Sequence, residues 1–266
     1  MHPLVNIAVK AARLAGKTIM HKSYRVDQLR YNAKGARDYV SEVDLKAQQQ
    51  IVETIREAYP GHAIIAEEQF SAPGKNYEWI IDPLDGTFNF LKGVPQFCVS
   101  IAIRSPRQVE HAVVYDPVHE ELYTASRGSG AQLNDRRVRV SNTSNLAETL
   151  IGTGFPFRDD DNLDLWTAIF RQLAKKTSGI RRPGSAALDL AAVACGRFDG
   201  FWESGLNLWD IAAGTLLVQE SGGMVSDFMG NQNFLETGMV VAGNSHIFDD
   251  LIKIVRQETQ LQQTDA

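Results

Sequence analysis

The segment Asp82-Pro83-Leu84-Asp85-Gly86-Thr87 is the part of this 266-residue chain whose residue types and spacing are best suited to chemistry. Two carboxylates stand three positions apart, directly after Glu78-Trp79-Ile80-Ile81, a run typical of a short buried strand. Pro83 fixes its own φ and pushes the residue before it towards an extended conformation. Gly86 allows a ligand to approach the backbone, and the N–H groups of Gly86 and Thr87 can face an anion. Oxygen ligands beside an anion site suit Mg²⁺ bound together with a phosphate, and an Asx-type turn with capping aspartates is the purely structural alternative.

Three further acidic residues, Asp44, Glu67 and Asp210, are expected at strand ends or helix starts. Each has a structural alternative. Asp44 lies three residues after Ser41 and could complete a capping box, Glu67 could be a surface residue, and Asp210 could complement a helix dipole. If these carboxylates converge, any two of them about 4 Å apart repel by roughly 4 kcal/mol at an effective dielectric near 20. Such a cluster needs protonation or divalent cations, and the cations would create a phosphate site.

The hydrophobic pattern predicts alternating helix and sheet layers that would position these residues. Helices are predicted at 3–21 and 42–58 and, beyond residue 146, near 163–176, 186–195, 209–220 and 246–257. Strands are predicted at 63–66, 97–103, 109–115, 121–126, 149–153, 199–203, 224–227 and 239–242, with an antiparallel sheet in the middle region. The polar residues 258–266 are predicted to fray. The pattern favours an α/β (α+β) layered sandwich and not a simple Rossmann unit, because no strand leads into G-x-G-x-x-G.

Length and composition fit one large domain or two closely joined halves. Hydrophobic residues make up 44% of the chain, enough for a substantial core, and the formal net charge of −5 argues against general nucleic-acid binding. Cys98 and Cys195 lie in apolar stretches, which favours buried free thiols in a reducing compartment. Lys10, Arg13 and Lys17 interrupt any signal-peptide core, and no apolar run is long enough to span a bilayer. We therefore expect a soluble cytoplasmic protein.

Zinc chemistry and serine-nucleophile chemistry are disfavoured. The six histidines show no H-x-x-H or H-E-x-x-H spacing. Ser185 lacks the G-x-S-x-G pattern of a nucleophile elbow, so a helix N-cap is the preferred interpretation. Trp166, Phe170 and Leu173 fall at helical spacing, which favours a core or interface position.

Several motifs, in order along the chain, resemble those of the inositol monophosphatase family. Residues 82–90 are similar to its first signature and 209–214 to its second, while 66–68 resemble its metal-binding glutamate segment and 39–44 the segment with its water-activating aspartate. The opening Met1-His2-Pro3, with 154–157 and 184–190, is closest to the bacterial SuhB branch. The resemblance covers nearly the whole chain. It implies a layered αβαβα sandwich of the sugar-phosphatase type in a single domain, 1–266, with an N-terminal half of about 1–145 and a C-terminal half of about 146–266.

The resemblance implies a Mg²⁺-dependent phosphomonoesterase with two to three ions in each active site. By this resemblance, Glu67, Asp82 and the Leu84 carbonyl would hold the first ion. Asp82, Asp85 and Asp210 would hold the second, and Glu67 with waters a weaker third.

Catalytic and substrate-binding residues also follow from the resemblance. Asp44 and Thr87, together with the metal ligand Glu67, would be catalytic, because Asp44 and Thr87 would orient and deprotonate the attacking water. The amides of Gly86 and Thr87 would bind the phosphate oxygens. The residues implied to contact the sugar or cyclitol are Asp85, Gly184, Ser185, Ala186 and Glu203.

Small departures from the family pattern remove none of these ligands. Phe88 stands where threonine is common and is expected to alter packing beneath the phosphate loop, and Gln69-Phe70 stands where a serine is usual. Lys34, Gly35, Arg37 and Asp38 match a loop that helps to close the site and place the third ion in the family.

The expected substrate is inositol 1-phosphate or a similar small polyol phosphate, and the family resemblance implies inhibition by Li⁺. Relatives also handle histidinol phosphate, fructose 1,6-bisphosphate and nucleotide 3′-phosphates. Glu203, seven positions before Asp210, resembles the inositol-type pattern, and no strong basic cluster for a second phosphate is evident. The region of Arg181-Arg182 lies near the family's dimer contact, so a homodimer is expected. The SuhB branch is associated with transcription antitermination, which makes a partner of RNA polymerase and Nus factors the alternative function.

Overall fold

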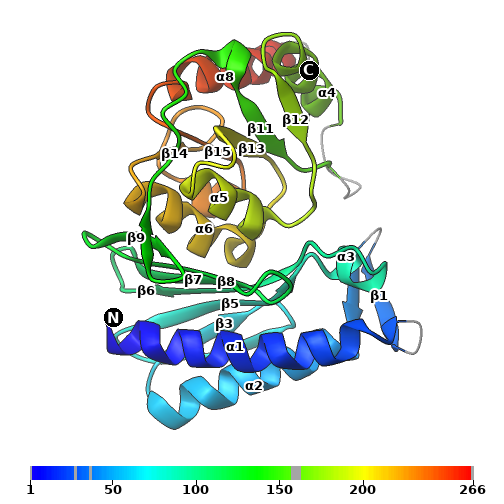
Figure 1. The fold of residues 1–266 in the computed structure, drawn as a ribbon, viewed down its shortest axis with the longest axis vertical. Coiled ribbons are helices and arrows are strands. Elements are labelled where there is room, and N and C mark those ends of the chain that lie inside the picture. The colour runs from blue at the N-terminus through cyan, green and yellow to red at the C-terminus, as the bar shows by residue number, and fades with distance from the viewer. Residues whose placement is uncertain (1, 27–28, 36–37, 157–162, 265–266) are drawn as a thin grey trace.

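Helices and sheets alternate in five layers, in the order helix, sheet, helix, sheet, helix (Figure 1). The computed structural model describes residues 2–26, 29–35, 38–156 and 163–264 of the chain. The layered αβαβα sandwich expected from the sequence is confirmed.

Helices α1 (Pro3–Ser23) and α2 (Glu42–Ala58) form the first layer. Pro3 stands in the first turn of α1, where its missing N–H costs nothing, and the His2 ring accepts the Leu4 N–H at 3.2 Å. The predicted apolar stripe of α1 is buried and rich in alanine, so that α1 packs closely on α2. Ser41 caps α2, and both ends of that helix agree with the prediction.

The second layer is an eight-stranded sheet in the order β10-β9-β8-β7-β6-β5-β3-β4. All its neighbouring strands are antiparallel except β3 and β5, which run parallel. Strand β5 is buried on both faces, which explains its continuous apolar run. The strands are β3 (Ala63–Ala66), β4 (Phe70–Ala72), β5 (Glu78–Asp85), β6 (Cys98–Arg104), β7 (Val109–Asp116), β8 (Glu121–Ser126), β9 (Gly130–Leu133) and β10 (Arg136–Val138).

The third layer consists of α5 (Ala186–Ala194) and α6 (Leu208–Glu220), which lie between the two large sheets (Figure 1). Both helices are apolar almost all round, as expected for helices covered on two sides. The fourth layer is a five-stranded sheet in the order β12-β11-β13-β15-β14, parallel in its first three strands and antiparallel in the rest. Its strands are β11 (Leu150–Thr153), β12 (Gly179–Arg181), β13 (Gly200–Glu203), β14 (Met224–Ser226) and β15 (Val240–Gly243).

Helices α4 (Leu163–Ala174) and α8 (Phe248–Thr264) cover the outer face of that sheet. A hairpin of β1 (Tyr31–Gly35) and β2 (Asp38–Ser41) leads into α2. Short helices α3 (Thr87–Leu91) and α7 (Phe234–Thr237) and a 3₁₀ turn (Leu146–Glu148) complete the fold.

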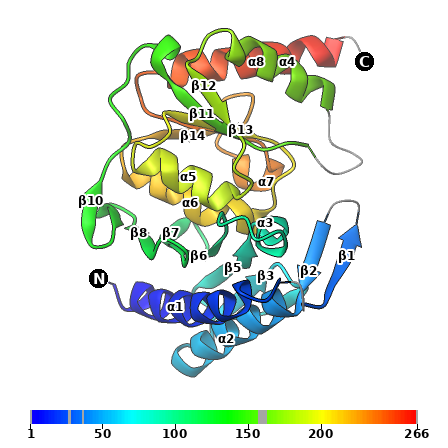
Figure 2. The same cartoon turned by 45° about the vertical axis from the view of Figure 1, so that its right-hand side comes forward.

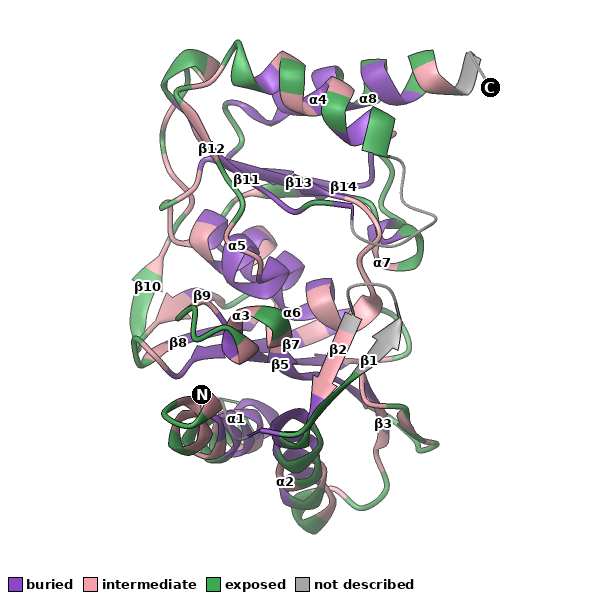
Figure 3. Cartoon of the chain, turned by 90° about the vertical axis from the view of Figure 1, so that its right-hand side faces the viewer, coloured by how far each residue is buried: buried purple, intermediate pink, exposed green. Residues whose placement is uncertain are grey.

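Buried residues gather between the layers, whereas the outward faces of the outer helices are exposed (Figure 3). Trp79 belongs to the cluster under α1 and α2, Phe201 to the cluster around α5 and α6, and Trp202 to the cluster under α4 and α8. Trp166 and Leu173 lie in the last of these, with Phe170 packed against it, as their helical spacing predicted. Within the described parts of the chain, none of the helices combines the length and apolar character that a bilayer crossing demands.

The prediction that residues 258–266 fray is wrong over most of that segment. Helix α8 continues to Thr264, and Glu258 and Thr259 are 8% and 6% exposed. Gln172 of α4 donates a 3.0 Å hydrogen bond to the Glu258 carboxylate, so packing on α4 holds a segment whose composition alone favours solvent. The sequence also gave no indication of strands β1, β2, β4, β9, β10 and β12, which are short or lie at sheet edges.

The two cysteines are free thiols, as predicted, but only Cys98 is buried. Cys195 is partly exposed because it stands at the C-terminal cap of α5, where the helix ends beside Gly196.

Candidate active site

Asp82 and Asp85 are brought to one face of the large sheet by a bulge in β5. Asp82 pairs with Ser100 of β6, whereas Asp85 pairs with Cys98, so three steps along β5 correspond to two along β6. In a regular strand, residues three apart point to opposite faces. The extra residue lies at Pro83-Leu84, the kind of position where a strand tolerates a proline. The predicted turn of both carboxylates towards one point thus has a specific backbone cause.

Asp44 both completes the capping box of α2 and accepts a hydrogen bond from the site residue Thr87. One carboxylate oxygen accepts the Ser41 N–H at 2.9 Å and the Ser41 hydroxyl at 2.5 Å, which completes the capping box of α2. The other accepts the Thr87 hydroxyl at 2.8 Å. The Thr87 hydroxyl also lies 3.0 Å from the Leu84 carbonyl oxygen. Asp44 is fully buried, so Thr87 stands between it and the cavity described below.

Asp210 likewise occupies the third position of a capping box. Its carboxylate accepts the Asn207 N–H at 2.7 Å at the start of α6. The helix start therefore fixes the position of a carboxylate that faces the same cavity as Asp82 and Asp85. The spacing of Asn207 and Asp210 is the sequence signature of such a box, so Asn207 was within reach of prediction.

Asp85 connects the two halves of the site. One of its oxygens accepts the Ser185 hydroxyl at 2.6 Å and the Ala187 N–H at 2.8 Å, both at the start of α5. Ser185 occupies the predicted N-cap position of α5 but makes no side-chain cap, because its hydroxyl is turned to Asp85. The Cys98 thiol lies 3.9 Å from the same carboxylate oxygen and 3.7 Å from the Ser185 hydroxyl.

The acidic residues Asp82, Asp85 and Asp210 line a cavity of about 410 Å³. It lies where the end of β5, α3 and the starts of α5 and α6 meet. Figure 2 shows α3 between the level of β5 and the level of α5 and α6. Every residue predicted for the site lines this cavity except Asp44, which lies behind Thr87. The predicted residues that line it are Glu67, Asp82, Leu84, Asp85, Gly86, Thr87, Gly184, Ser185, Ala186, Glu203 and Asp210.

The carboxylates of the cavity interact strongly. Burial raises the pKa of Asp82 well above its usual value, and the charges of Glu67, Asp85 and Asp210 raise it further. Burial also raises the pKa of Asp85 to about 6, although the hydrogen bonds from Ser185 and Ala187 act in the opposite direction. A cluster with these properties binds protons, or cations in their place.

Asp44 and Asp189 show the same preference for a neutral form. Burial raises the pKa of Asp44, and its hydrogen bonds with Ser41 and Thr87 partly offset that rise. Asp189 of α5 is 1% exposed, and neither of its oxygens has a hydrogen-bond partner in the described residues. Burial, together with the charges of Glu203 and Asp85, raises its pKa well above the usual value.

Two glycines of the cavity are required by close contacts. Gly86 has a φ of 92°, and a Cβ there would lie 2.7 Å from the Gln96 carbonyl oxygen. A Cβ on Gly154 would lie 1.8 Å from an Oε atom of Glu203. Gly86 thus permits the turn into α3, and Gly154 leaves room for the buried Glu203 carboxylate.

Asn89 is a structural residue of the site that sequence reasoning missed. Its amide donates to the carbonyl oxygens of Gln96 at 2.8 Å, Pro183 at 2.9 Å and Gly184 at 3.2 Å. It therefore joins α3 to the loop before α5. The hydrogen-bond partners of Asn89 lie up to 95 positions away in sequence, so no local sequence pattern predicts them.

The expectation for Phe88 is wrong. Phe88 does not pack beneath the phosphate loop: it is 50% exposed at the cavity mouth, where its ring stacks on that of Tyr39 with centroids 5.3 Å apart. Across the mouth, Arg182 lies over the Phe155 ring at 5.0 Å. Tyr39, Phe88 and Phe155 were not predicted to line the cavity.

The segment predicted to close the site is only partly described. Arg37 lies outside the described residues, and the side chains of Lys34, Gly35 and Asp38 are likewise not described. The backbone there belongs to the hairpin of β1 and β2, and β2 contacts α3.

The donors in the cavity fit a hard divalent cation, since they are carboxylate oxygens and one backbone carbonyl. In the described residues, however, no three His, Cys, Asp or Glu side chains stand as a ready-made metal-ligand group. The carboxylates instead engage hydrogen-bond donors and one another: Asp82 accepts the Leu84 N–H at 2.9 Å and shares a side-chain hydrogen bond with Glu67.

Comparisons with known proteins agree with this architecture. The model of the inositol monophosphatase family matches residues 1–260. The Nus factor SuhB of Pseudomonas aeruginosa is 55% identical over 262 residues, which cover 96% of this chain and 97% of that protein. The solved structure of the extragenic suppressor protein SuhB from Bartonella henselae has a TM-score of 0.93 at 42% identity, covering 96% of this chain and 99% of that chain. That of the inositol monophosphatase from Anabaena (Nostoc) sp. has a TM-score of 0.83 at 37% identity, covering 96% and 95%. The chain therefore belongs to the inositol monophosphatase family, in its bacterial SuhB branch.

Proposed function

We propose that the chain is a Mg²⁺-dependent phosphomonoesterase that hydrolyses inositol 1-phosphate or a similar small polyol phosphate. One observation carries the proposal: Glu67, Asp82, Asp85 and Asp210 line one cavity beside the first amides of α3, and the other three all raise the pKa of Asp82. Membership of a phosphatase family that is generally Mg²⁺-dependent supports it.

The proposed sites for two to three Mg²⁺ ions use the donors of this cavity. Glu67, Asp82 and the Leu84 carbonyl would hold a first ion, and Asp82, Asp85 and Asp210 a second. Glu67, with waters, would hold a weaker third. When bound, Mg²⁺ lowers the pKa of a coordinated water and neutralises phosphate charge, the role that metal ions play in such hydrolyses.

Asp44 and Thr87 are proposed to handle the proton of the attacking water. Because the Thr87 hydroxyl donates to Asp44 at 2.8 Å, its oxygen can accept from a water in the cavity while Asp44 holds the hydroxyl in place. As Thr87 takes a proton from that water, its own hydroxyl proton passes to the Asp44 carboxylate, which ends protonated. The raised pKa of Asp44 makes it a better proton acceptor than an exposed aspartate.

The start of α3 is proposed to bind the phosphate oxygens. The first hydrogen bond within this turn runs from the Phe90 N–H to the Gly86 carbonyl at 3.0 Å, so the N–H groups of Gly86 and Thr87 precede the helical ladder. Both residues line the cavity, where such donors suit an anion.

The rest of the substrate is proposed to contact Asp85, Gly184, Ser185, Ala186 and Glu203. All five line the cavity, whose volume of about 410 Å³ is in the range of small-molecule sites. The Glu203 carboxylate can accept hydroxyl groups of a polyol. Histidinol phosphate and fructose 1,6-bisphosphate are the alternative substrates within the same chemistry.

Phosphate release from the purified protein with Mg²⁺ tests the proposal. The substrates are inositol 1-phosphate, glycerol 2-phosphate, histidinol phosphate and fructose 1,6-bisphosphate, each with and without Li⁺. We expect Li⁺-sensitive turnover of inositol 1-phosphate, and Asp82→Asn should reduce it by at least about 10²- to 10³-fold while the protein stays folded. Asp250→Asn, an exposed aspartate of α8, is the matched control and should retain full activity.

Full activity of Asp82→Asn would contradict the proposed mechanism. Turnover that Li⁺ leaves unchanged would contradict the second ion site at Asp82, Asp85 and Asp210. Absence of turnover on all four substrates, with Mg²⁺ binding demonstrated calorimetrically, would favour the second candidate function.

The second candidate function is that of a transcription antitermination partner. It is supported by the Nus factor SuhB of Pseudomonas aeruginosa, which matches 96% of the chain at 55% identity. A pull-down with purified RNA polymerase and Nus proteins tests it, and retention of none of them would exclude it. The two functions are compatible, because one uses a cavity and the other an outer surface.

We further propose that the chain works as a single domain in a cytoplasmic homodimer. The exposed Arg181-Arg182 segment is the expected contact. Light scattering after size exclusion measures the mass, and a species of 29.5 kDa would contradict the dimer.

A further inference from the structure

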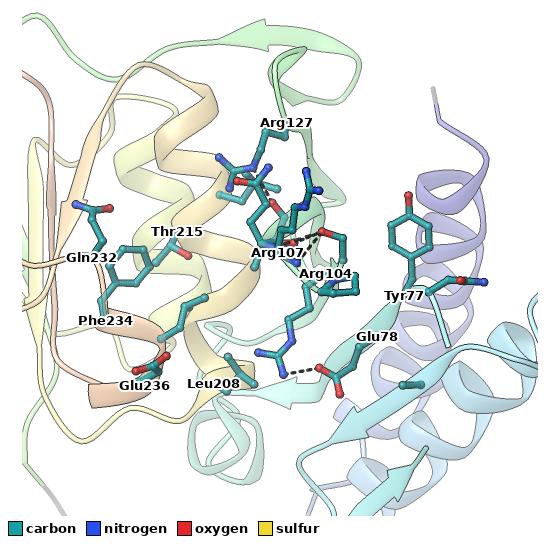
Figure 4. A pocket seen from close by; sticks show the side chains of 18 of the residues that line it. Tyr77, Glu78, Arg104, Arg107, Arg127, Leu208, Thr215, Gln232, Phe234 and Glu236 are labelled. Carbon is teal, nitrogen blue, oxygen red and sulfur yellow. Dashed lines mark hydrogen bonds and ion pairs between the residues drawn. The ribbon is translucent and has the colours of Figure 1, made fainter. Parts of the chain in front are cut away.

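A second cavity, of about 900 Å³, lies apart from the carboxylate cavity and shares none of its lining residues. It opens between the turn that joins β6 to β7, the start of β5, and helices α6 and α7. Figure 4 shows Arg104, Arg107 and Arg127 on one wall, with Gln232, Phe234 and Glu236 across from them. The function proposed above makes no use of this cavity.

Four basic side chains line the described part of the cavity: two are fixed by contacts with the protein, and two are exposed. Arg104 pairs with Glu78 at 2.5 Å (Figure 4). Arg127 is anchored by hydrogen bonds from Nε to the Val109 carbonyl at 2.8 Å and from Nη2 to Gln219 at 3.3 Å. The other two, Lys75 and Arg107, are exposed.

Lys75 and Arg107 carry uncompensated charge into the cavity. Across the described residues, neither side chain forms a hydrogen bond or ion pair with the protein. Among the described residues that line the cavity, two are acidic, Glu78 and Glu236, and Glu78 is already paired with Arg104. The lining is therefore net positive in a chain whose formal net charge is −5. A concave wall of one sign concentrates ions of the other.

The floor of the cavity is apolar. Leu208 and Leu216 come from α6, and Phe234 and Leu235 from α7. Leu216 and Phe234 are 1% and 5% exposed, so they form a packed base and not a mobile surface. Amide side chains at the edge, among them Gln108 and Gln232, add hydrogen-bonding groups. A charged wall above an apolar floor is the arrangement of a site for a small amphiphilic ligand.

We propose that this cavity binds an organic anion that carries an apolar body. Lys75 and Arg107 pair with its anionic group, Arg127 presents its guanidinium from a fixed position, and the apolar body covers Phe234 and Leu235. Its volume is at the upper end of the range for small-molecule pockets, which suits a ligand larger than a polyol phosphate.

The cavity and the carboxylate site share structural elements. Strand β5 begins at Glu78 in this cavity and ends at Asp85 in the other. Asn207 lines the carboxylate cavity, and the next residue, Leu208, lines this one. A bound anion would thus rest on the same strand and helix that carry Asp82, Asp85 and Asp210.

A fluorescence titration of the full-length protein, in Mg²⁺, with anilinonaphthalenesulfonate tests the proposal. This probe joins a sulfonate to an apolar ring system and is not a phosphatase substrate. We expect saturable binding at one site per chain. The double variant Lys75→Glu/Arg107→Glu should weaken binding at least about tenfold, because it reverses the two unpaired charges. The matched control Lys175→Glu/Lys176→Glu makes the same change of net charge at exposed positions elsewhere and should bind like the parent.

Three results would overturn the proposal: no saturable binding to the parent, equal binding by the Lys75/Arg107 double variant, or equal weakening in the control. A loss of binding in Phe155→Ser alone would place the probe in the carboxylate cavity and would also count against it. Thermal melting of every variant checks folding, and all four charged residues are exposed. Since no readout involves phosphate release, failure here is distinct from failure of the proposed phosphatase function.

Discussion

The Ser185 hydroxyl donates a 2.6 Å hydrogen bond to the Asp85 carboxylate and so ties the start of α5 to the end of β5 across 100 positions of sequence. The adjacent Ala187 N–H donates to the same oxygen at 2.8 Å. These two hydrogen bonds stabilise the Asp85 carboxylate, which the neighbouring carboxylates Glu67 and Asp82 repel. The site is therefore assembled by a contact between its two halves.

We expect Ser185→Ala to destabilise the protein and to raise the pKa of Asp85. Hydrogen bonds to charged groups contribute about 1.5–3 kcal/mol, and only the Ala187 N–H and the weakly donating Cys98 thiol would remain among the described donors to this oxygen. Denaturant unfolding in Mg²⁺-free buffer measures the loss. Ser245→Ala, at an exposed position, is the control. Equal stability of the two variants would contradict a stabilising role of the Ser185–Asp85 hydrogen bond.

Thr87→Val should reduce kcat by about 100-fold and leave Mg²⁺ affinity nearly unchanged. The valine keeps the shape of the side chain but removes the hydroxyl that donates to Asp44 at 2.8 Å. Thr87→Ser retains the hydroxyl and should recover most of the activity. Steady-state kinetics with calorimetric Mg²⁺ titration separate the two effects, and a Thr87→Val enzyme with parental kcat would rule out the proton path through this residue.

Gly154→Ala should raise KM for a polyol phosphate by about tenfold, with a smaller effect on kcat. The added Cβ would lie 1.8 Å from the Glu203 carboxylate, which is 7% exposed and has little space to move. Gly61→Ala is a suitable control because nothing lies within 4 Å of the corresponding Cβ. If both variants keep the parental KM, Glu203 does not contact the substrate.

Protonation of Asp85 should make the metal-free protein more stable as pH falls from about 6 to about 4. The folded-state pKa of Asp85 is raised from 3.8 to about 6, so between these values the folded state binds a proton that the unfolded state lacks. Stability therefore falls as pH rises through that window, by at most about 3 kcal/mol from this group.

Comparison with Asp85→Asn isolates this effect, because the lowered pKa values of His62 and His111 act in the opposite direction. Thermal melting across this pH range should show a steeper gain on acidification for the parent than for the variant. Saturating Mg²⁺ should abolish the difference in slope, since a bound cation keeps the carboxylates ionised. Identical slopes in metal-free buffer would show that Asp85 is not buried as described.

Much of the local structure was predictable because short-range interactions encode it. The Ser41–Asp44 and Asn207–Asp210 capping boxes connect residues three apart, so this spacing alone predicts them. The ends of α2 and of β3 agree with the prediction: α2 has a cap at one end and a Pro-Gly stop at the other, and β3 is a short apolar run after that stop.

Phe88 and the C-terminal segment show where local reasoning fails. The neighbours of Phe88 in sequence say nothing of Tyr39, whose ring draws it to the cavity mouth. The polar composition of 258–264 favours solvent, but α4 supplies a partner for Glu258 from 86 positions away. Packing between distant elements outweighs intrinsic preference in both cases.

The residue types of the carboxylate site, their strand-end and helix-start positions and the glycine turn before α3 can all be predicted from the sequence, because capping, proline and glycine act within a few residues. Convergence cannot. The pairs Asp44–Thr87, Asp85–Ser185 and Asn89–Pro183 join positions 43, 100 and 94 apart, and they meet only because two sheets and two buried helices stack in one order. Such contacts follow from burying the apolar faces of whole layers, a property of the complete fold and not of any segment.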